Sequence, residues 1–296
     1  MSKCTLCPRQ CGADREAGEL GYCQMGGEIR IARAALHPFE EPPISGSRGS
    51  GTVFFCGCSL RCVFCQNKVI SRAETEGRAV TPRELSEIFL RLQDEGAHNV
   101  NLVTPTHFLP GIREALLLAK DSLRIPVVYN TSGYERVEIL QSLEGLVDVY
   151  LPDMKYASSE LAARYSAAPD YPEVAIKAIC EMYRQTGSVV FDEDRLLRRG
   201  VVVRHLVLPG SREDSVKVLE LLAKHLPTDG ILISLMSQYT PEFAADCDFA
   251  PLKRRLTTFE YQTVVKAAER LGLDGFIQQR SSASAAYTPD FKNSTV

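Results

Sequence analysis

From residue 51 onward, short apolar runs alternate along the chain with stretches of helical periodicity. Most of the runs are rich in Val, Ile and Leu and carry no polar face, which is typical of strands buried on both sides of a parallel sheet. The runs that we predict to be strands are residues 52–56, 99–104, 126–130, 147–151, 201–208 and 231–236, with a last short one near 275–278.

The intervals between these runs predict helices. Thr81 and Glu84 have the spacing of a capping box, with Pro82 at the first helical position, and an apolar stripe follows. Further helices are expected from Ser211 to about residue 225 and over residues 261–271. Repeated strand–helix units require right-handed parallel crossovers, so the class is α/β, either a doubly wound sheet or a barrel. With six or seven strands we expect a partial barrel.

Residues 1–50 lack long periodic segments and hold four cysteines with many Gly and Pro residues. Such a segment has little hydrophobic core of its own, so we expect a bound metal to stabilise its fold. We therefore predict a cysteine-rich extension at residues 1–50 and a barrel at residues 51–296.

Polar residues gather just past the predicted strands, where ligands bind in barrels. These segments are residues 56–65, 104–107, 130–134, 152–155, 209–211 and 237–239. The strands before them are apolar. The contrast predicts one polar face over a packed core.

Composition narrows the classes of partner. The chain has 296 residues, with 34 basic and 37 acidic side chains and a net charge of -3, so no basic field indicates a nucleic acid or an anionic membrane. The first residues contain no apolar leader, and no apolar run approaches the roughly 20 residues of a membrane span. We expect a cytoplasmic protein without a nucleic-acid or membrane partner.

Ten cysteines are many for this length, and eight of them lie within the first 65 residues. A secreted disulfide framework is the usual alternative, but the missing leader and the clustering favour metal ligands. Cys56, Cys180 and Cys247 are expected to be small core residues.

Cys58, Cys62 and Cys65 form a C-x3-C-x2-C pattern directly after the apolar run at residues 52–56. Three cysteinates can hold three irons of a [4Fe–4S] cube and leave the fourth iron without a protein ligand. An open metal position can bind a small molecule. Packed thiols or a zinc loop are the alternatives.

Cys4, Cys7, Cys11 and Cys23 form a second group. Four thiolates close a metal site, which suits structural zinc or an auxiliary [4Fe–4S] cluster, and the spacing does not separate the two. Uncoordinated thiols are the third alternative.

The three-cysteine motif, with Phe64 before its last cysteine, resembles the signature of the radical S-adenosylmethionine (SAM) superfamily. Residues 40–46, 49–66 and 104–107 resemble its pyruvate formate-lyase activating enzyme-like subfamily. Residues 203–210 and 130–133, together with Asp153 and Lys155, resemble glycyl-radical activases. The resemblance extends from the first cysteines to about residue 279.

This resemblance implies a partial (β/α)6 barrel that holds SAM against a [4Fe–4S] cluster. One electron at low potential would cleave the sulfonium to methionine and a 5′-deoxyadenosyl radical, which abstracts a hydrogen atom. The implied partners are a glycyl-radical protein as substrate and a reductant such as flavodoxin or ferredoxin.

The resemblance also implies roles for SAM-binding residues. Phe64 is expected near the adenine, Asn130 or Ser132 at the ribose, and Arg204 at the carboxylate. The family's Gly-Gly-Glu motif is replaced here by residues 104–107, so Thr104 or Thr106 would contact the amino group.

Catalytic candidates are fewer. His107 sits at a strand end and is a candidate for contact with substrate or SAM, while Asp153 and Lys155 would line the active site. Glu40 and Glu41 are either proton carriers or part of a solvated loop.

Two other functions compete. One is an epimerase or dehydrogenase of a small molecule or peptide, for which Cys180 or Cys247 would be the hydrogen donor. The other is a non-catalytic iron–sulfur or zinc protein.

Overall fold

The computed structural model describes residues 3–278 and residue 291. Met1, Ser2 and residues 279–290 and 292–296 lie outside the described residues, so the ends of both predicted domains do too. The strands are β1 (Ile29–His37), β2 (Ser50–Phe55), β3 (Arg78–Val80), β4 (Val100–Val103), β5 (Val127–Thr131), β6 (Val149–Pro152), β7 (Val190–Phe191), β8 (Leu197–Leu206), β9 (Leu232–Met236) and β10 (Gly275–Ile277).

The helices lie mostly between the parallel strands. They are α1 (Pro42–Ser45), α2 (Lys68–Ser71), α3 (Pro82–Asp94), α4 (Leu109–Ala119), α5 (Val137–Gln141), α6 (Ser159–Ser166), α7 (Tyr171–Thr186), α8 (Arg212–His225) and α9 (Thr258–Arg270), with 3₁₀ turns at Thr106–Phe108, Pro241–Ala244 and Ala250–Lys253.

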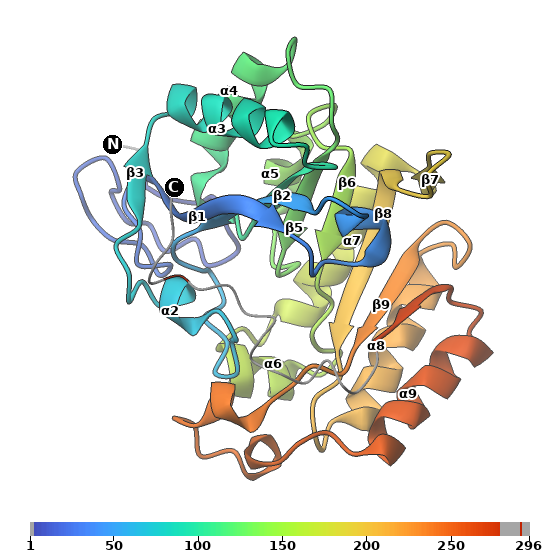
Figure 1. Ribbon diagram of the computed structural model, residues 1–296. Coiled ribbons are helices and arrows are strands. Elements are labelled where there is room, and N and C mark those ends of the chain that lie inside the picture. Colours follow the sequence, from blue (N-terminus) through green and yellow to red (C-terminus); the bar gives the residue numbers. More distant parts are fainter. Residues whose placement is uncertain (1–2, 279–290, 292–296) are drawn as a thin grey trace.

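One curved sheet organises the molecule (Figure 1). Its order is β10-β9-β8-β6-β5-β4-β2-β1-β3, and neighbours from β10 to β2 run parallel. β10 and β3 are the two edges, and no pairing joins them within the described residues. The predicted partial α/β barrel is therefore confirmed as an open sheet.

The seven parallel strands occupy the seven predicted apolar runs, with ends that differ by a few residues. β2, β4 and β6 are buried along their whole length, so both of their faces need apolar side chains. β1 was not predicted. It pairs antiparallel with β2, and the predicted domain boundary after residue 50 falls within β2, so residues on both sides of that boundary belong to one sheet.

Helices cover the outer face of the sheet, with α3 packed on α4 and α8 packed on α9 (Figure 1). The predicted capping box of α3 is present: Thr81 Oγ1 accepts from Glu84 N–H at 3.2 Å, and Glu84 Oε2 accepts from Thr81 N–H at 2.8 Å. α8 starts after Ser211 as predicted, although the Ser211 side chain makes no cap bond. None of the helices in the described part of the chain has the length and apolar character needed to cross a bilayer.

Candidate active site

The carboxyl ends of the parallel strands surround a cavity of about 580 Å³. This volume lies within the range of small-molecule and cofactor sites, about 300–1,000 Å³. Side chains from many regions of the barrel reach it. Its wall includes the three cysteines of the C-x3-C-x2-C motif, the loop before α1, the ends of β4, β5, β6, β8 and β9, and β10.

The cysteine loop, residues 56–67, connects β2 to α2 and closes one side of this cavity. Gly57 and Arg61 adopt left-handed backbone conformations, with φ of 82° and 54°. For Arg61 this conformation costs free energy, which a well-defined turn must offset. The turn places Cys58, Cys62 and Cys65 together on the cavity wall.

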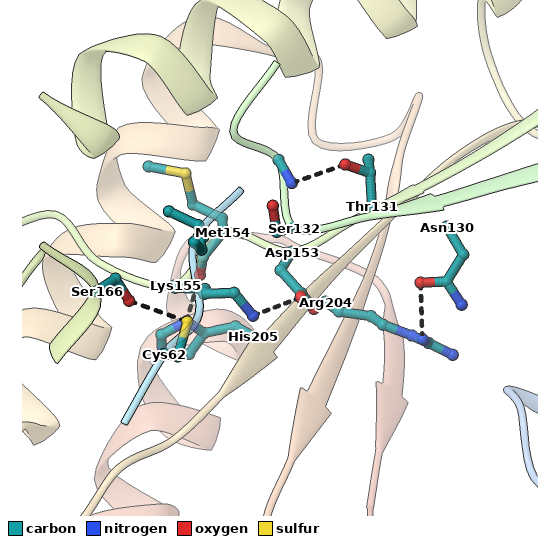
Figure 2. Close-up of polar contacts among 12 residues, drawn as sticks. Cys62, Asn130, Thr131, Ser132, Asp153, Met154, Lys155, Ser166, Arg204 and His205 are labelled. Carbon is teal, nitrogen blue, oxygen red and sulfur yellow. Dashed lines mark hydrogen bonds and ion pairs between the residues drawn. The ribbon is translucent and has the colours of Figure 1, made fainter. Parts of the chain in front are cut away.

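The sulfur atoms of this loop already have hydrogen-bond donors. Leu60 N–H donates to Cys58 Sγ at 3.4 Å, and Ser166 Oγ donates to Cys62 Sγ at 2.9 Å (Figure 2). Burial, followed by the nearby Cys62, raises the pKa of Cys58 to about 12, so the free thiol keeps its proton. A metal takes the place of that proton, and hydrogen bonds to sulfur tune a cluster's potential. The three residues thus fit the ligand set of a [4Fe–4S] cluster, which they would hold at the cavity wall.

Asp153 and Lys155 follow β6 and face the cavity beside the cysteines. Lys155 Nζ lies 2.5 Å from Asp153 Oδ2 (Figure 2). Burial by itself would lower the pKa of Lys155, but the Asp153 carboxylate raises it above its ordinary value. The ammonium is therefore charged, and it adds a fixed positive group close to Cys62 and Cys65.

Tyr171, at the start of α7, joins the loops after β5 and β6. Its hydroxyl oxygen accepts from Lys155 N–H at 2.9 Å and lies 2.8 Å and 2.9 Å from the carbonyl oxygens of Ser132 and Asp153. Sequence reasoning missed this residue, because it is distant in sequence from both loops and lies outside any strand end.

Arg204 projects from β8 into the cavity, and its partners are Glu40 and Glu41. Its Nε donates to Glu41 Oε1 at 2.8 Å, its Nη2 donates to Glu41 Oε2 at 2.6 Å, and Nη2 also contacts Glu40. Burial opposes the charged guanidinium, but both carboxylates raise its pKa. Asn101, on β4, donates to Glu40 Oε1 at 3.1 Å. A SAM carboxylate at Arg204 would have to share it with two carboxylates already in place.

The other predicted cofactor residues also line the cavity: Phe64, Thr104, Asn130 and Ser132. Phe64 stands edge-on to Tyr156, Tyr165 and Tyr239, with ring centroids 6.2–6.5 Å apart. Asn130 Oδ1 lies 3.5 Å from Arg204 Nη1 (Figure 2).

Thr104 has a φ of 60°, which is uncommon for a β-branched residue and marks local strain at the cavity. Thr106, the alternative to it, is buried away from the wall and donates to Glu135 Oε1 at 2.6 Å. The structure therefore favours Thr104 for contact with a ligand.

Burial raises the pKa of Glu135 to about 7. Glu135 was not among the predicted site residues, although it follows the polar segment at residues 130–134.

His107 does not belong to the cavity wall. It is 2% exposed, its ring contacts Phe108, and its Nε2 lies 2.6 Å from the Cys56 carbonyl oxygen. Burial lowers its pKa to about 4. This geometry supports a neutral ring that holds the backbone before Cys58, and it gives no support to direct substrate contact.

Cys4, Cys7, Cys11 and Cys23 gather in the N-terminal loops. Cys7 and Cys23 are buried, and Cys11 is exposed. No three His, Cys, Asp or Glu side chains among residues 3–278 and 291 lie close enough to share a single metal ion. Cys58, Cys62 and Cys65 are no exception within these residues.

Comparison with known proteins identifies the family. The family model of the radical SAM superfamily matches residues 52–242. The chain is 32% identical over 284 residues to Uncharacterized protein MJ0674 of Methanocaldococcus jannaschii, covering 93% of this chain and 76% of that protein. It is also 27% identical over 169 residues to Uncharacterized protein MJ0808 of the same organism, covering 52% of this chain and 49% of that protein.

Solved structures share the fold. SuiB of Streptococcus suis bound to its precursor peptide SuiA superposes with a TM-score of 0.52 at 14% identity, covering 75% of this chain and 46% of that one. Methylornithine synthase (PylB) gives 0.50 at 16% identity, covering 74% of this chain and 60% of that one. This chain thus spans less than half of SuiB. Its barrel, its three-cysteine loop and the family match over residues 52–242 place the chain in the radical SAM superfamily.

Proposed function

We propose that this protein binds SAM beside a [4Fe–4S] cluster held by Cys58, Cys62 and Cys65, and that it abstracts a hydrogen atom from a glycyl residue of a protein or peptide partner. The observation that carries the proposal is the placement of all three thiols on the wall of one cavity at the strand ends. When bound, the cluster and SAM supply one-electron cleavage of the sulfonium to methionine and a 5′-deoxyadenosyl radical.

The chain's own residues bind and orient the cofactor. Lys155 offers a charged ammonium to the SAM carboxylate beside the cysteine loop, while Asp153 fixes its position. Thr104 offers polar atoms to the amino group, and Phe64 an apolar face to the adenine. Asn130 and Ser132 offer acceptors and donors to the ribose.

The rest of the cavity wall keeps water away from the reacting carbon. Several buried aromatic rings surround Phe64, including Tyr156 and Tyr165. A primary alkyl radical attacks most C–H bonds, so the site must exclude unwanted donors. Close packing on this side satisfies that requirement.

A protein or peptide substrate is supported by two observations. The segments that resemble glycyl-radical activases, including Arg204, Asp153 and Lys155, meet at this cavity. SuiB, which has a similar fold, is bound to a precursor peptide. By contrast, Cys180 and Cys247, the predicted hydrogen donors for an epimerase, do not line the cavity.

Anaerobic reconstitution with iron and sulfide, followed by dithionite and SAM, tests the cleavage step. We expect 5′-deoxyadenosine from the wild-type protein and at least a 100-fold loss in Cys62→Ala, because one cluster ligand is missing. Cys180→Ala is the matched control and should keep its activity, since Cys180 lies on α7 outside the cavity. Retained turnover in Cys62→Ala would contradict the ligand assignment.

Deuterium transfer tests the substrate. The reconstituted protein is incubated with SAM, dithionite and either the protein fraction or the small-molecule fraction of cells grown on deuterated glycine. We expect deuterium in 5′-deoxyadenosine with the protein fraction. Deuterium only with the small-molecule fraction would refute the glycyl assignment and favour the metabolite alternative.

A further inference from the structure

A buried serine from outside the cysteine loop contacts one of the three cysteines of the cavity. Ser166 is the last residue of α6, and its Oγ lies 2.9 Å from Cys62 Sγ (Figure 2). On its other side the same Oγ lies 2.8 Å from the hydroxyl oxygen of Tyr156. Ser166 and Tyr156 are only 2% and 1% exposed, so water has little access to either contact.

The chemistry of a ligating cysteine determines the direction of both hydrogen bonds. A cysteine that holds a metal is a thiolate, which carries no proton and can only accept. The single hydrogen of the Ser166 hydroxyl therefore points to Cys62 Sγ. Since Ser166 has no second hydrogen to offer, Tyr156 is the donor in their contact. The result is a chain of two donors, from Tyr156 to Ser166 and from Ser166 to Cys62, in which the first bond polarises and strengthens the second.

Other hydrogen bonds hold the end of α6 against the cysteine loop. Val63 N–H donates to the Tyr165 carbonyl at 2.9 Å. Arg9 donates from Nη2 to the Ser166 carbonyl at 2.7 Å and from Nε to the Ser59 carbonyl at 2.8 Å. The last carbonyl groups of a helix have no partner within the helix, so these bonds also satisfy acceptors of α6. The Ser166 hydroxyl is thus positioned at the cysteine loop by contacts other than its own bond to sulfur.

Aromatic neighbours fix the ring of Tyr156. This residue follows Lys155 after β6, and its ring stands edge-on to those of Tyr171 and Phe64, with centroids 5.4 Å and 6.4 Å away. A buried tyrosine hydroxyl usually finds a hydrogen-bond partner, and here Ser166 provides it. Both hydroxyl groups of the chain are therefore held in place before any metal binds.

Hydrogen bonds to cysteine sulfur change the reduction potential of an iron–sulfur cluster. Reduction adds one negative charge, which is shared among the irons and their sulfur ligands. A donor to sulfur stabilises the reduced state more than the oxidised state, because a hydrogen bond becomes stronger as the charge on its acceptor grows. The effect is larger in a buried site, where the effective dielectric constant is low. A fixed hydroxyl donor at Cys62 therefore makes the cluster easier to reduce.

We propose that Ser166 and Tyr156 are positioning residues that act through Cys62: their hydrogen-bond chain raises the reduction potential of the cluster and brings it within reach of a low-potential flavodoxin or ferredoxin. One electron passes from that reductant to the cluster, both hydroxyl groups keep their protons, and no covalent bond forms or breaks. This inference rests on the proposed function for the cluster at Cys62, but the potential is measured without SAM and without a substrate.

The test is a redox titration of the reconstituted full chain, followed by electron paramagnetic resonance. At equal applied potential, the ratio of reduced to oxidised cluster should fall about three- to tenfold in Ser166→Ala, which for one electron is a shift of about 28–59 mV to lower potential. Tyr156→Phe keeps the ring and removes only the hydroxyl, so its shift should be smaller and of the same sign. Ser215→Ala is the matched control and should keep the wild-type potential, because Ser215 is also 2% exposed but lies on α8 and donates to the Ser211 carbonyl at 3.2 Å.

A merely structural role would lower stability or iron content and leave the potential where it is. Potentials of Ser166→Ala and Tyr156→Phe equal to that of the control, or shifted upward, would overturn the inference. If Ser166→Ala holds no cluster, the sign of the shift in Tyr156→Phe decides. Electron–nuclear double resonance of the reduced cluster in H₂O and D₂O gives a second measurement: one exchangeable proton coupling of the wild-type protein should be lost in Ser166→Ala, and its retention would refute the assigned donor.

Failure of the proposed function gives a different result. The same wild-type preparation is incubated with SAM and dithionite, and 5′-deoxyadenosine is measured. Lowered potentials in both variants without any 5′-deoxyadenosine from the wild-type protein would support the hydrogen-bond chain and count against the proposed function.

Discussion

Replacing Arg204 by methionine should destabilise the protein strongly, and more at high pH than at low pH. Arg204 is the partner of Glu40 and Glu41, whose side chains are only 7% and 6% exposed. Removing one member of a buried ion pair typically costs about 3–5 kcal/mol, because the remaining charge is left without compensation. At about 2–3 °C per kcal/mol for a chain of this size, the thermal midpoint should fall by about 6–15 °C at pH 8.

The pH dependence follows from the pKa of Glu41. In the wild-type protein burial would raise this pKa, but Arg204 lowers it below the ordinary value, so its contribution is present above pH 4.5 and lost as pH falls. In Arg204→Met only the hydrogen bonds from Ser234 and from the Glu41 backbone still oppose burial, so the pKa of Glu41 should rise. Protonation then favours the folded variant, and stability is lost as pH rises through the new pKa. The gap between the two proteins should widen from pH 5 to pH 8.

The assay is thermal unfolding of proteins with matched iron content, at pH 5, 6.5 and 8. Arg199→Met is the control, since Arg199 is an exposed residue of the same strand and should change stability by less than about 0.5 kcal/mol. Adding Glu40→Gln and Glu41→Gln to Arg204→Met should restore part of the loss. A loss equal to that of the control, or one independent of pH, would refute the reasoning.

Three further outcomes are expected. Gly57→Ala should destabilise the protein by about 2–5 kcal/mol, because the strain of a left-handed backbone adds to overpacking. Gly145→Ala, at a position with a φ of 77° and open space around it, should cost only about 1–2 kcal/mol. Equal thermal midpoints of the two variants would exclude the tight contact at Gly57. Glu260→Gln should lower the free energy of unfolding in urea by about 1.5–3 kcal/mol at pH 7, because it weakens the hydrogen bonds from Arg254. Those bonds hold the pKa of Glu260 below 4.5, so the difference between the two proteins should shrink as pH falls toward 3. The pH profile of 5′-deoxyadenosine formation between pH 5.5 and 8 should keep its shape in His107→Gln, because burial lowers the pKa of His107 to about 4. A step near pH 6.5 that is present in the wild-type protein and absent from the variant would contradict this.

Much of the fold could be predicted because buried parallel strands leave a continuous apolar signal. The run at residues 99–104 predicted β4 in this way, and all four residues of that strand are buried. β1 was missed because its buried positions are interrupted by half-buried ones, including Arg30 and His37. α7 was missed because its buried positions include Glu181 and Thr186, which blur the apolar stripe.

The candidate site could be predicted as far as strand ends determine it. Asp153, Lys155 and Asn130 follow strands and line the cavity as expected. The partners of Arg204 could not be foreseen, since Glu40 and Glu41 are 164 and 163 residues away in sequence. His107 also follows a strand, but its ring contacts the backbone of a neighbouring loop and does not line the cavity, so its contact with substrate or SAM stays a prediction.

The two carboxylates that share one guanidinium give the cavity an excess of negative charge. A sulfonium cation gains from such a field, whereas the uncharged thioether left after demethylation or the uncharged nucleoside left after cleavage does not. We therefore expect tighter retention of S-adenosylmethionine than of S-adenosylhomocysteine. The excess negative charge at Glu40, Glu41 and Arg204 would therefore let the cavity distinguish the sulfonium cofactor from its uncharged products.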